Sequence, residues 1–310
     1  MDVLYATYPL SAGFIVFMIT LTIIIITLIF GFFGAVILIA CMYLGIVHVT
    51  PIFKASAYII DLLNPGLREK VRANIYNSFS VEYSSSLPKT PHIFAFHPHG
   101  IFSVANLLHI GTDLTEWSHK PIKGTISDKV TYFPAAEEII DVMNFVTSDY
   151  NHMKEVIDKG SSLTVCMGGV REVLYIQPNK LTLTILKKQG IFRLAIETGK
   201  PLVPVITYGE NEILDLLDTP FISWIQKKLI PHGMALLIPT PESSKRWYNI
   251  VNEPLKEKIR TVIGNPIEVG EPRKATHDEI VNLRERYFVE LRKLYKKTKP
   301  ASYAEEIDIV

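Results

Sequence analysis

Cysteine is scarce in this sequence, since only Cys41 and Cys166 occur among its 310 residues. Two cysteines so far apart provide neither a disulfide framework nor a thiolate metal site. One lies in a long apolar run and the other in a strand-like run, so we interpret both as small packing residues. Their scarcity fits a reducing compartment such as the cytosol.

An excess of basic residues is also missing. The chain has 32 Lys and Arg against 31 Asp and Glu, which gives a formal net charge of +1. Proteins that bind nucleic acid need cations to neutralise phosphates. We therefore predict no nucleic-acid partner.

Charged residues are absent from the whole stretch between Gly13 and Val49. A membrane-spanning helix needs about 20 apolar residues, and this run is considerably longer. Gly31 and Gly34 lie near its middle. We predict that residues 1–50 form a membrane segment, as a helical hairpin bent near these glycines or as one tilted helix. A cleaved signal peptide fits less well, because no Lys or Arg precedes the run.

The first basic residues after this run are Lys54, Arg68, Lys70 and Arg72. Because positive charge gathers on the cytosolic side of membranes, the rest of the chain is predicted to face the cytosol. Residues 51–91 are interpreted as an interfacial linker. Its amphipathic piece, Leu67–Phe79, would lie on the membrane or form an ordinary surface helix.

From His92 onward, strand-like and helix-like runs alternate, which predicts an α/β domain over residues 92–310. The expected strands are His92–Phe96, Lys123–Thr125 with Lys129–Tyr132, Ser162–Met167, Leu202–Thr207, Met234–Ile238 and Thr261–Ile263. The expected helices are Ile101–Ile110, Ala135–Phe145, Tyr150–Lys159, Ile191–Thr198 and Phe221–Leu229.

A last long helix is predicted to begin at a capping box formed by Thr276 and Glu279. It carries a stripe of residues at helical spacing that we interpret as packing, namely Ile280, Leu283, Tyr287, Leu291 and Leu294. The tail from Lys296 onward is expected to be solvated.

Two histidines stand at the end of the first expected strand, in the sequence His97-Pro98-His99-Gly100. Open α/β sheets bind ligands at the carboxyl ends of their strands. Histidine exchanges protons near neutral pH, so we predict a general base here. A zinc half-site or a purely structural pair are the alternatives. No set of Cys, Asp or Glu at ligand spacing accompanies the histidines, and no metal site is predicted.

A second expected strand ends in Gly168-Gly169, and Arg171 and Glu172 follow at once. Glycine lets the backbone approach a ligand closely. Glu172 is a candidate for holding a histidine and stabilising its imidazolium, and Arg171 for binding phosphates or an oxyanion. Alone, this pattern also fits a solvated turn.

A third expected strand ends at Gly209, followed by Glu210, Asn211 and Glu212. Three strand ends with glycines and polar residues indicate one site assembled along a sheet edge.

Together these blocks resemble the type-2 diacylglycerol acyltransferase family, which includes monoacylglycerol and wax-alcohol acyltransferases. The resemblance spans roughly Phe94 to Tyr295. It rests on Phe96–Gly100, on Gly168-Gly169 with Glu172, on the block from Lys188 to Glu212, and on Trp224–Lys228.

The resemblance implies a mixed sheet flanked by helices, as in glycerolipid acyltransferases. It also implies transfer of a fatty acyl group from acyl-CoA to a neutral acceptor lipid, at the endoplasmic reticulum membrane and lipid-droplet surface. Acyl-CoA is then a co-substrate, and no further cofactor is expected. The acceptor is predicted to be diacylglycerol, with monoacylglycerol or a long-chain alcohol as alternatives. A catalytically silent neutral-lipid-binding protein and a metal-dependent lipid hydrolase are rival hypotheses.

The site residues follow from both lines of reasoning. The His-x4-Asp pattern of glycerolipid acyltransferases is not met, because Phe102 and Val104 stand at the fifth positions, so Glu172 is expected to orient the histidine. His99 is predicted to be the base, and backbone amides of the following helix are expected to stabilise the oxyanion. The full set is His99, His97 and Glu172 as catalytic residues, with Pro98, Gly100, Gly168, Gly169, Arg171, Glu210 and Asn211 binding substrate.

Overall fold

The computed structural model describes residues 77–85, 90–101, 103–110, 122–132, 144–248, 253–255 and 258–310, with six isolated positions at 70, 73, 74, 137, 140 and 141. The predicted membrane segment 1–50, most of the linker 51–91 and most of the helix expected at Ala135–Phe145 lie outside the described residues. Among the described residues, no helix has the length and apolarity needed to cross a bilayer.

A seven-stranded sheet forms the centre of the fold, in the order β1-β8-β7-β2-β5-β3-β4. Neighbouring strands are parallel except β7 and β8, which are antiparallel. The α/β class and the mixed sheet are thus confirmed. The strands are β1 (Phe79–Tyr83), β2 (Ile93–His97), β3 (Lys123–Ile126), β4 (Phe145–Thr147), β5 (Leu163–Cys166), β7 (Leu202–Tyr208) and β8 (Ile259–Ile263).

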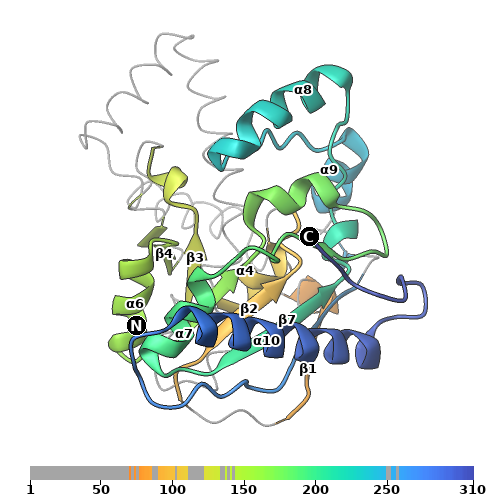
Figure 1. The fold of residues 1–310 in the computed structure, drawn as a ribbon. Helices are drawn as coiled ribbons and strands as arrows, with labels where there is room; N and C mark the ends of the chain where they lie inside the picture. The colour runs from red at the N-terminus through yellow and green to blue at the C-terminus, as the bar shows by residue number, and fades with distance from the viewer. Residues whose placement is uncertain are drawn as a thin grey trace.

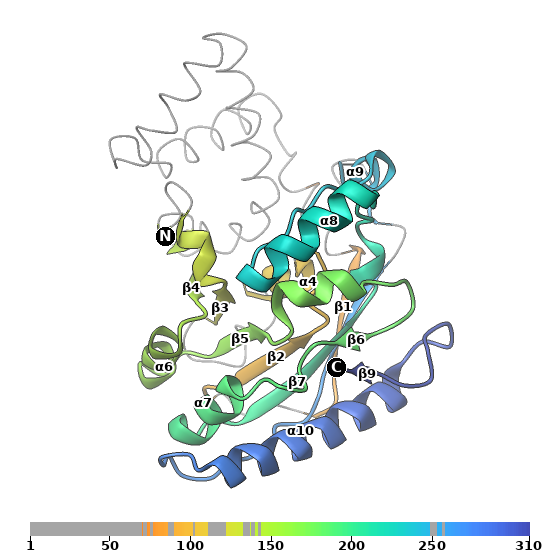
Figure 2. The same cartoon turned by 45° about the horizontal axis from the view of Figure 1, so that its top comes forward.

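Helices flank this sheet on both faces, as Figures 1 and 2 show. The described α-helices are α4 (Val104–Ile110), α6 (Tyr150–Asp158), α7 (Gly190–Thr198), α8 (Pro220–Leu229), α9 (Pro241–Tyr248) and α10 (His277–Thr298). Short 3-10 helices are η3 (Asp128–Tyr132), η4 (Gly169–Tyr175), η5 (Glu210–Glu212) and η6 (Ile230–His232). Helices α7 and α10 cover one face of the sheet, and α4 lies on the other.

Strand β2 occupies the middle of the sheet and is buried along its whole length. Its alternate side chains point to opposite faces. Ile93 and Ala95 join the cluster that includes α7 and α10, whereas Phe94 and Phe96 pack with residues of β7 and β8. By the same alternation, His97 points toward α10.

Helix α10 begins as predicted. The Thr276 side chain accepts a bond from the Glu279 amide, and the Glu279 carboxylate accepts one from the Thr276 amide. The expected stripe of Ile280, Leu283, Tyr287, Leu291 and Leu294 is buried against the sheet.

Two predicted strands are wrong. Lys129–Tyr132 lies in the 3-10 helix η3, where Val130 N bonds Ser127 O and the Thr131 hydroxyl bonds Asp128 O. These local bonds replace the partners that a sheet would supply. Met234–Ile238 forms no strand, because the Gln226 side chain bonds both the N–H and the C=O of Leu236.

Both ends of the domain hold more structure than expected. The tail is not simply solvated, since Tyr303 and Ile307 are buried and β9 (Asp308–Ile309) pairs with β6 (Thr182–Leu183). Strand β1 falls within the range assigned to the linker, yet it pairs with β8 in the main sheet.

Candidate active site

The three segments that end in glycines and polar residues lie at one edge of the sheet. Strand β2 is flanked by β5 and β7, and both pairs are parallel. The carboxyl ends of these strands therefore meet at the same edge, which confirms the expected assembly.

His97 is completely buried and inaccessible to solvent. Its Nε2 lies 2.7 Å from the hydroxyl of Tyr287 on α10. Its Nδ1 has no hydrogen-bond partner among the described residues. Burial lowers the pKa of His97 to about 3, so its ring is neutral near pH 7.

His99 is partly exposed, and its ring has one defined contact. Its Nδ1 lies 2.8 Å from the carbonyl oxygen of Gly100. A carbonyl only accepts, so Nδ1 carries the hydrogen and Nε2 keeps its lone pair in the neutral ring. Burial lowers the pKa of His99, and the Gly100 carbonyl opposes this in part. The ring is thus neutral near pH 7, and its Nε2 bonds no described residue.

Glu172 holds the backbone of this turn rather than the histidine ring. Its Oε2 accepts a bond of 2.7 Å from the His99 amide, and its Oε1 accepts one of 3.0 Å from the Thr184 amide. Glu172 thus contacts His99 through the main chain and not through the imidazole. Burial raises the pKa of Glu172 to about 7, although the two amides favour the carboxylate.

Glu210, which follows the neighbouring strand β7, likewise binds backbone amides of the chain after β2. Its carboxylate accepts bonds of 2.6 Å from Val104 N and 3.0 Å from Ala105 N. Burial raises the pKa of Glu210 to about 7. The prediction that α4 amides stabilise an oxyanion is wrong for these two donors, because a carboxylate already occupies them.

Glycines make room for both carboxylates. A Cβ added at Gly168 would lie 1.8 Å from Glu172 Oε1, and one at Gly100 would lie 2.6 Å from Glu210 Cγ. Gly100 also has a φ of 59°, a conformation that favours glycine. Gly169 has a φ of 64° and open space around the position of a Cβ.

The remaining predicted residues have varied surroundings. Pro98 is buried and follows a cis peptide bond. The Asn211 side chain donates to Lys180 O over 3.1 Å, which ties a loop to the sheet edge. Arg171 is exposed, and its charge helps to lower the pKa of Lys188, whose burial is the larger cause. The structure thus gathers the histidines and glutamates and leaves Arg171 outside them.

Sequence reasoning missed three contributors. Tyr287 was assigned to packing alone, yet it is the partner of His97. A tyrosine within an apolar stripe needs a partner for its hydroxyl, which is the signal that would have found it. Thr184 contributes its amide to Glu172 and its hydroxyl to Gly168 O. Ser103 lies 2.8 Å from the thiol of Cys166, and no local signal marks that contact.

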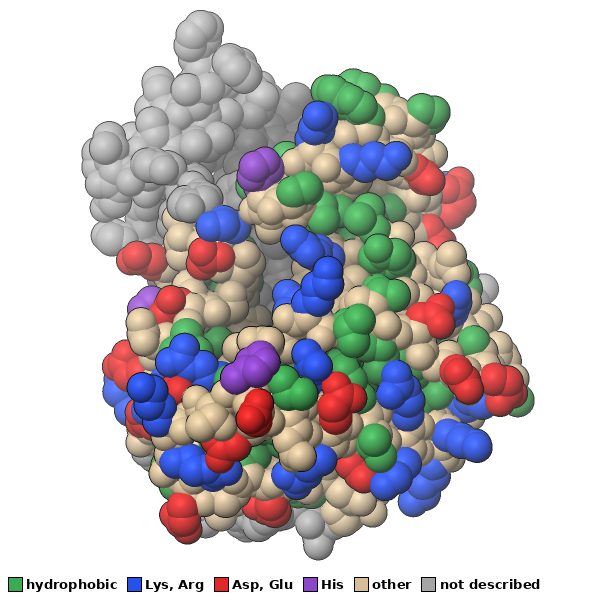
Figure 3. Space-filling model, viewed as in Figure 1, with side chains coloured by type: hydrophobic (Ala, Val, Ile, Leu, Met, Phe, Trp, Pro, Cys, Tyr) green, Lys and Arg blue, Asp and Glu red, His purple; other side chains and the backbone are tan. Residues whose placement is uncertain are grey.

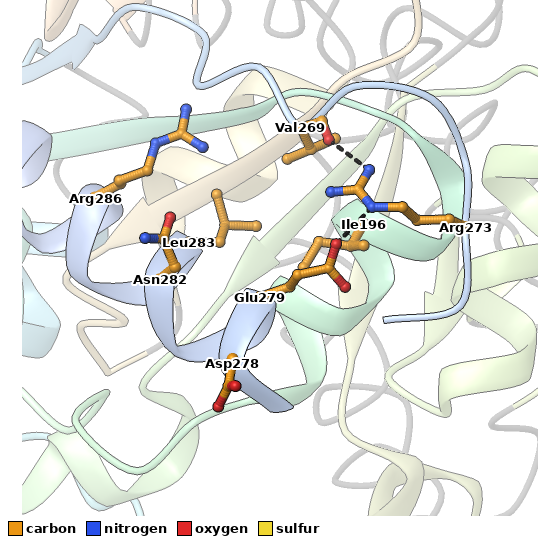
Figure 4. Close-up of a pocket in the computed structure, with 8 residues that line it drawn as sticks. All are labelled: Ile196, Val269, Arg273, Asp278, Glu279, Asn282, Leu283 and Arg286. Carbon is orange, nitrogen blue, oxygen red and sulfur yellow. Dashed lines mark hydrogen bonds and ion pairs between the residues drawn. The ribbon is translucent and has the colours of Figure 1, made fainter. Parts of the chain in front are cut away.

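A cavity of about 290 Å³ lies elsewhere, between α7, the residues before α10 and the start of α10 (Figure 4). Its lining is Ile196, Val269, Arg273, Asp278, Glu279, Asn282, Leu283 and Arg286, which includes none of the site residues. Arg273 bonds Glu279 and the carbonyl of Val269 there. Across the described part of the chain, no three His, Cys, Asp or Glu residues form a group that could hold a metal ion.

Comparison with known proteins adds four findings. Residues 29–308 match the family model described as Diacylglycerol acyltransferase. The chain is 28% identical to 2-acylglycerol O-acyltransferase 1 of Homo sapiens over 227 residues, covering 68% of this chain and 66% of that protein. It is 27% identical to Diacylglycerol O-acyltransferase 2 of Dictyostelium discoideum, covering 68% and 67%.

The match to the human relative thus spans slightly less than two thirds of its length. Among solved structures, the 1-acyl-sn-glycerophosphate (LPA) acyltransferase PlsC from Thermotoga maritima matches with a TM-score of 0.41 and 18% identity, over 74% of this chain and 79% of that chain.

Replacing Gly168 with alanine should release the backbone of the histidine turn. The new Cβ would collide with the Glu172 carboxylate, which must then leave the His99 and Thr184 amides. We expect faster hydrogen exchange at both amides, measured by mass spectrometry. Gly190→Ala is the matched control, because no atom lies within 4 Å of its Cβ position. Unchanged protection in Gly168→Ala would contradict this role for Glu172.

The two buried carboxyls should also make stability fall as pH rises. Their folded pKa values of about 7 lie above the unfolded values, so this stabilisation is fully present only below the unfolded pKa values and is lost as the pH rises to about 7. Between pH 5 and 7 we expect the free energy of unfolding to drop by about 2 kcal/mol for each carboxyl.

Urea unfolding of the detergent-solubilised chain at the two pH values measures this drop. Glu210→Gln should remove about half of it. An identical drop in the variant would show that Glu210 does not titrate as described.

Proposed function

Because the chain belongs to the diacylglycerol acyltransferase family, we propose that it transfers a fatty acyl group from acyl-CoA to the hydroxyl of an acylglycerol. The observation that carries the mechanism is the state of His99. This neutral ring is fixed through Nδ1 by the Gly100 carbonyl, and its Nε2, which bonds none of the described residues, can accept a proton.

In the proposed reaction, the acceptor oxygen attacks the thioester carbonyl carbon while His99 Nε2 takes the hydroxyl proton. The tetrahedral intermediate then expels CoA sulfur as the carbon–sulfur bond breaks. The sulfur receives the proton from the His99 imidazolium, which yields the ester and free CoA and restores the neutral ring.

The acceptor itself is the nucleophile in this scheme, and no acyl-enzyme is formed. Cys166 is the one described thiol at this edge of the sheet. Burial raises its pKa to about 12, so it stays protonated near neutral pH and is a poor nucleophile. Ser103 lies against this thiol, with no described histidine as its partner.

His97 and Glu172 act as positioning residues. His97 is inaccessible to substrate and anchors the turn to α10 through Tyr287. Glu172 fixes the main chain of His99 and thereby the direction of its ring. Arg171 lies close enough to Lys188 to help lower the pKa of that lysine, and two such cations suit the phosphates of CoA.

Diacylglycerol is our first choice of acceptor, which makes triacylglycerol the product. Monoacylglycerol is a second candidate, because the human relative is named 2-acylglycerol O-acyltransferase 1. Expression in cells without neutral-lipid synthesis distinguishes them by the neutral lipid that accumulates. No new neutral lipid and no acyl transfer in membranes would favour the silent lipid-binding alternative.

We further propose that the enzyme works at the endoplasmic reticulum membrane and the lipid-droplet surface, with the catalytic domain facing the cytosol. The uncharged run from Gly13 to Val49 and the basic residues after it support this placement. Acylglycerols partition into bilayers, whereas acyl-CoA arrives from the aqueous side.

Replacing His99 with alanine should lower the rate of acyl transfer by about 10²- to 10⁴-fold, the usual contribution of a general base. The rate is measured in membranes with labelled acyl-CoA. His232→Ala is the control, because His232 is exposed and lies in η6. Near-normal transfer by His99→Ala, at equal protein abundance, would exclude His99 as the base.

A further inference from the structure

Helix α8 presents two large aromatic side chains to solvent. Phe221 is 68% exposed and Trp224 is 59% exposed. Their rings are stacked, with centroids 6.3 Å apart and an interplanar angle of 18°. Two stacked aromatic rings at the surface cost free energy in water unless something covers them.

The opposite side of the same helix is fixed to the protein. Ile222 and Gln226 are buried, and the Gln226 side chain bonds the N–H and C=O of Leu236 over 2.9 and 2.6 Å. Thr219 caps the helix by accepting a bond from the Ile222 amide. Phe221 and Trp224 are therefore held outward by a rigid helix, and packing does not require them there.

Further apolar side chains surround this pair. Leu217 and Ile238 are joined by a backbone bond of 2.7 Å, and Met234 follows the helix. We call the five exposed residues the α8 patch, namely Leu217, Phe221, Trp224, Met234 and Ile238. Figure 3 shows hydrophobic side chains gathered over α8, with Lys and Arg side chains beside them.

The charge on helix α8 itself has one sign, although the exposed Asp218 lies beside Leu217 and accepts a hydrogen bond from the Ser223 hydroxyl. No Asp or Glu occurs from Pro220 to Pro239, whereas Lys227 and Lys228 end the helix. Both lysines are exposed, and within the described residues neither forms an ion pair. Lys228 lies on the same helical face as Phe221 and Trp224, at positions i, i+3 and i+7.

We propose that the α8 patch docks into the interfacial layer of a lipid bilayer with anionic headgroups. Aromatic rings, tryptophan above all, favour the boundary between acyl chains and headgroups. Lysines next to them extend toward lipid phosphates. The uncharged run from Gly13 to Val49 is long enough to anchor the chain in a bilayer. Such an anchor would keep the α8 patch near the headgroups of that bilayer.

Further exposed apolar side chains lie on the element that carries Glu172. Leu174 and Tyr175 are exposed on η4, the same short helix that carries the buried Glu172. Figure 3 shows further hydrophobic side chains below α8 on the same face of the molecule. Docking through α8 would thus bring this face of the domain against the layer that dissolves a neutral acceptor.

Fluorescence of Trp224 tests the proposal. The sequence has three tryptophans, so W117F/W247F leaves Trp224 as the only one. This full-length variant is reconstituted into phosphatidylcholine–phosphatidylserine vesicles with plain or brominated acyl chains, because bromine quenches only nearby indoles. We expect brominated lipid to remove most of the Trp224 emission.

The matched control moves the reporter to the other side of the sheet. Val289 is 48% exposed on α10, so W117F/W224F/W247F with Val289→Trp carries its only indole on that helix. Its emission should be the same in both lipids. Equal quenching at positions 224 and 289 would overturn the proposal.

Two further results bear on it. K227Q/K228Q should reduce the ratio of docked to undocked helix by about fivefold for each charge removed. Protection of Trp224 from aqueous iodide without quenching by brominated lipid would mean that a protein or a second copy covers the patch, and would overturn bilayer docking. The measurement needs no turnover, so failure of docking and failure of the proposed acyl transfer are separate results.

Discussion

The histidine turn depends on carboxylates that reach it from the strands on either side. Glu172 follows β5 and bonds the His99 amide, and Glu210 follows β7 and bonds the first amides of α4. Both carboxylates are buried, and a buried carboxylate without such donors would be strongly unfavourable. Each one therefore fixes the main chain after β2 from one side.

This arrangement explains the glycines around the site. A Cβ at Gly168 would collide with Glu172, and one at Gly100 would collide with Glu210. Glycine at these positions therefore lets each carboxylate lie close to the backbone. The same arrangement explains why the two histidines have different surroundings. His97 continues the alternation of β2 into the core and contacts Tyr287, whereas His99 lies beyond the strand, and its Nε2 bonds no residue in the part of the chain that the structure describes.

Much of this fold follows from patterns in the sequence, because the central strands β2, β5 and β7 are mostly apolar and a glycine follows shortly after each of them. The same reasoning brought His97, Glu172 and Glu210 to one edge. It failed where a side chain supplies the hydrogen bonds of the backbone, as Gln226 does for Leu236. It left open which atoms of His99 Glu172 would contact, since spacing cannot tell a ring nitrogen from an amide. Tyr287 was missed because its contact joins residues 190 positions apart.

The central claim is that His99 is held as a neutral ring with its hydrogen on Nδ1 and its lone pair on Nε2. Nitrogen NMR of the chain labelled with ¹⁵N-histidine, assigned through a His99→Gln variant, measures this directly. At pH 7 the His99 signals should be those of a neutral ring protonated at Nδ1, with Nε2 in the range of an unprotonated nitrogen. A proton on Nε2, or an imidazolium at that pH, would contradict the account.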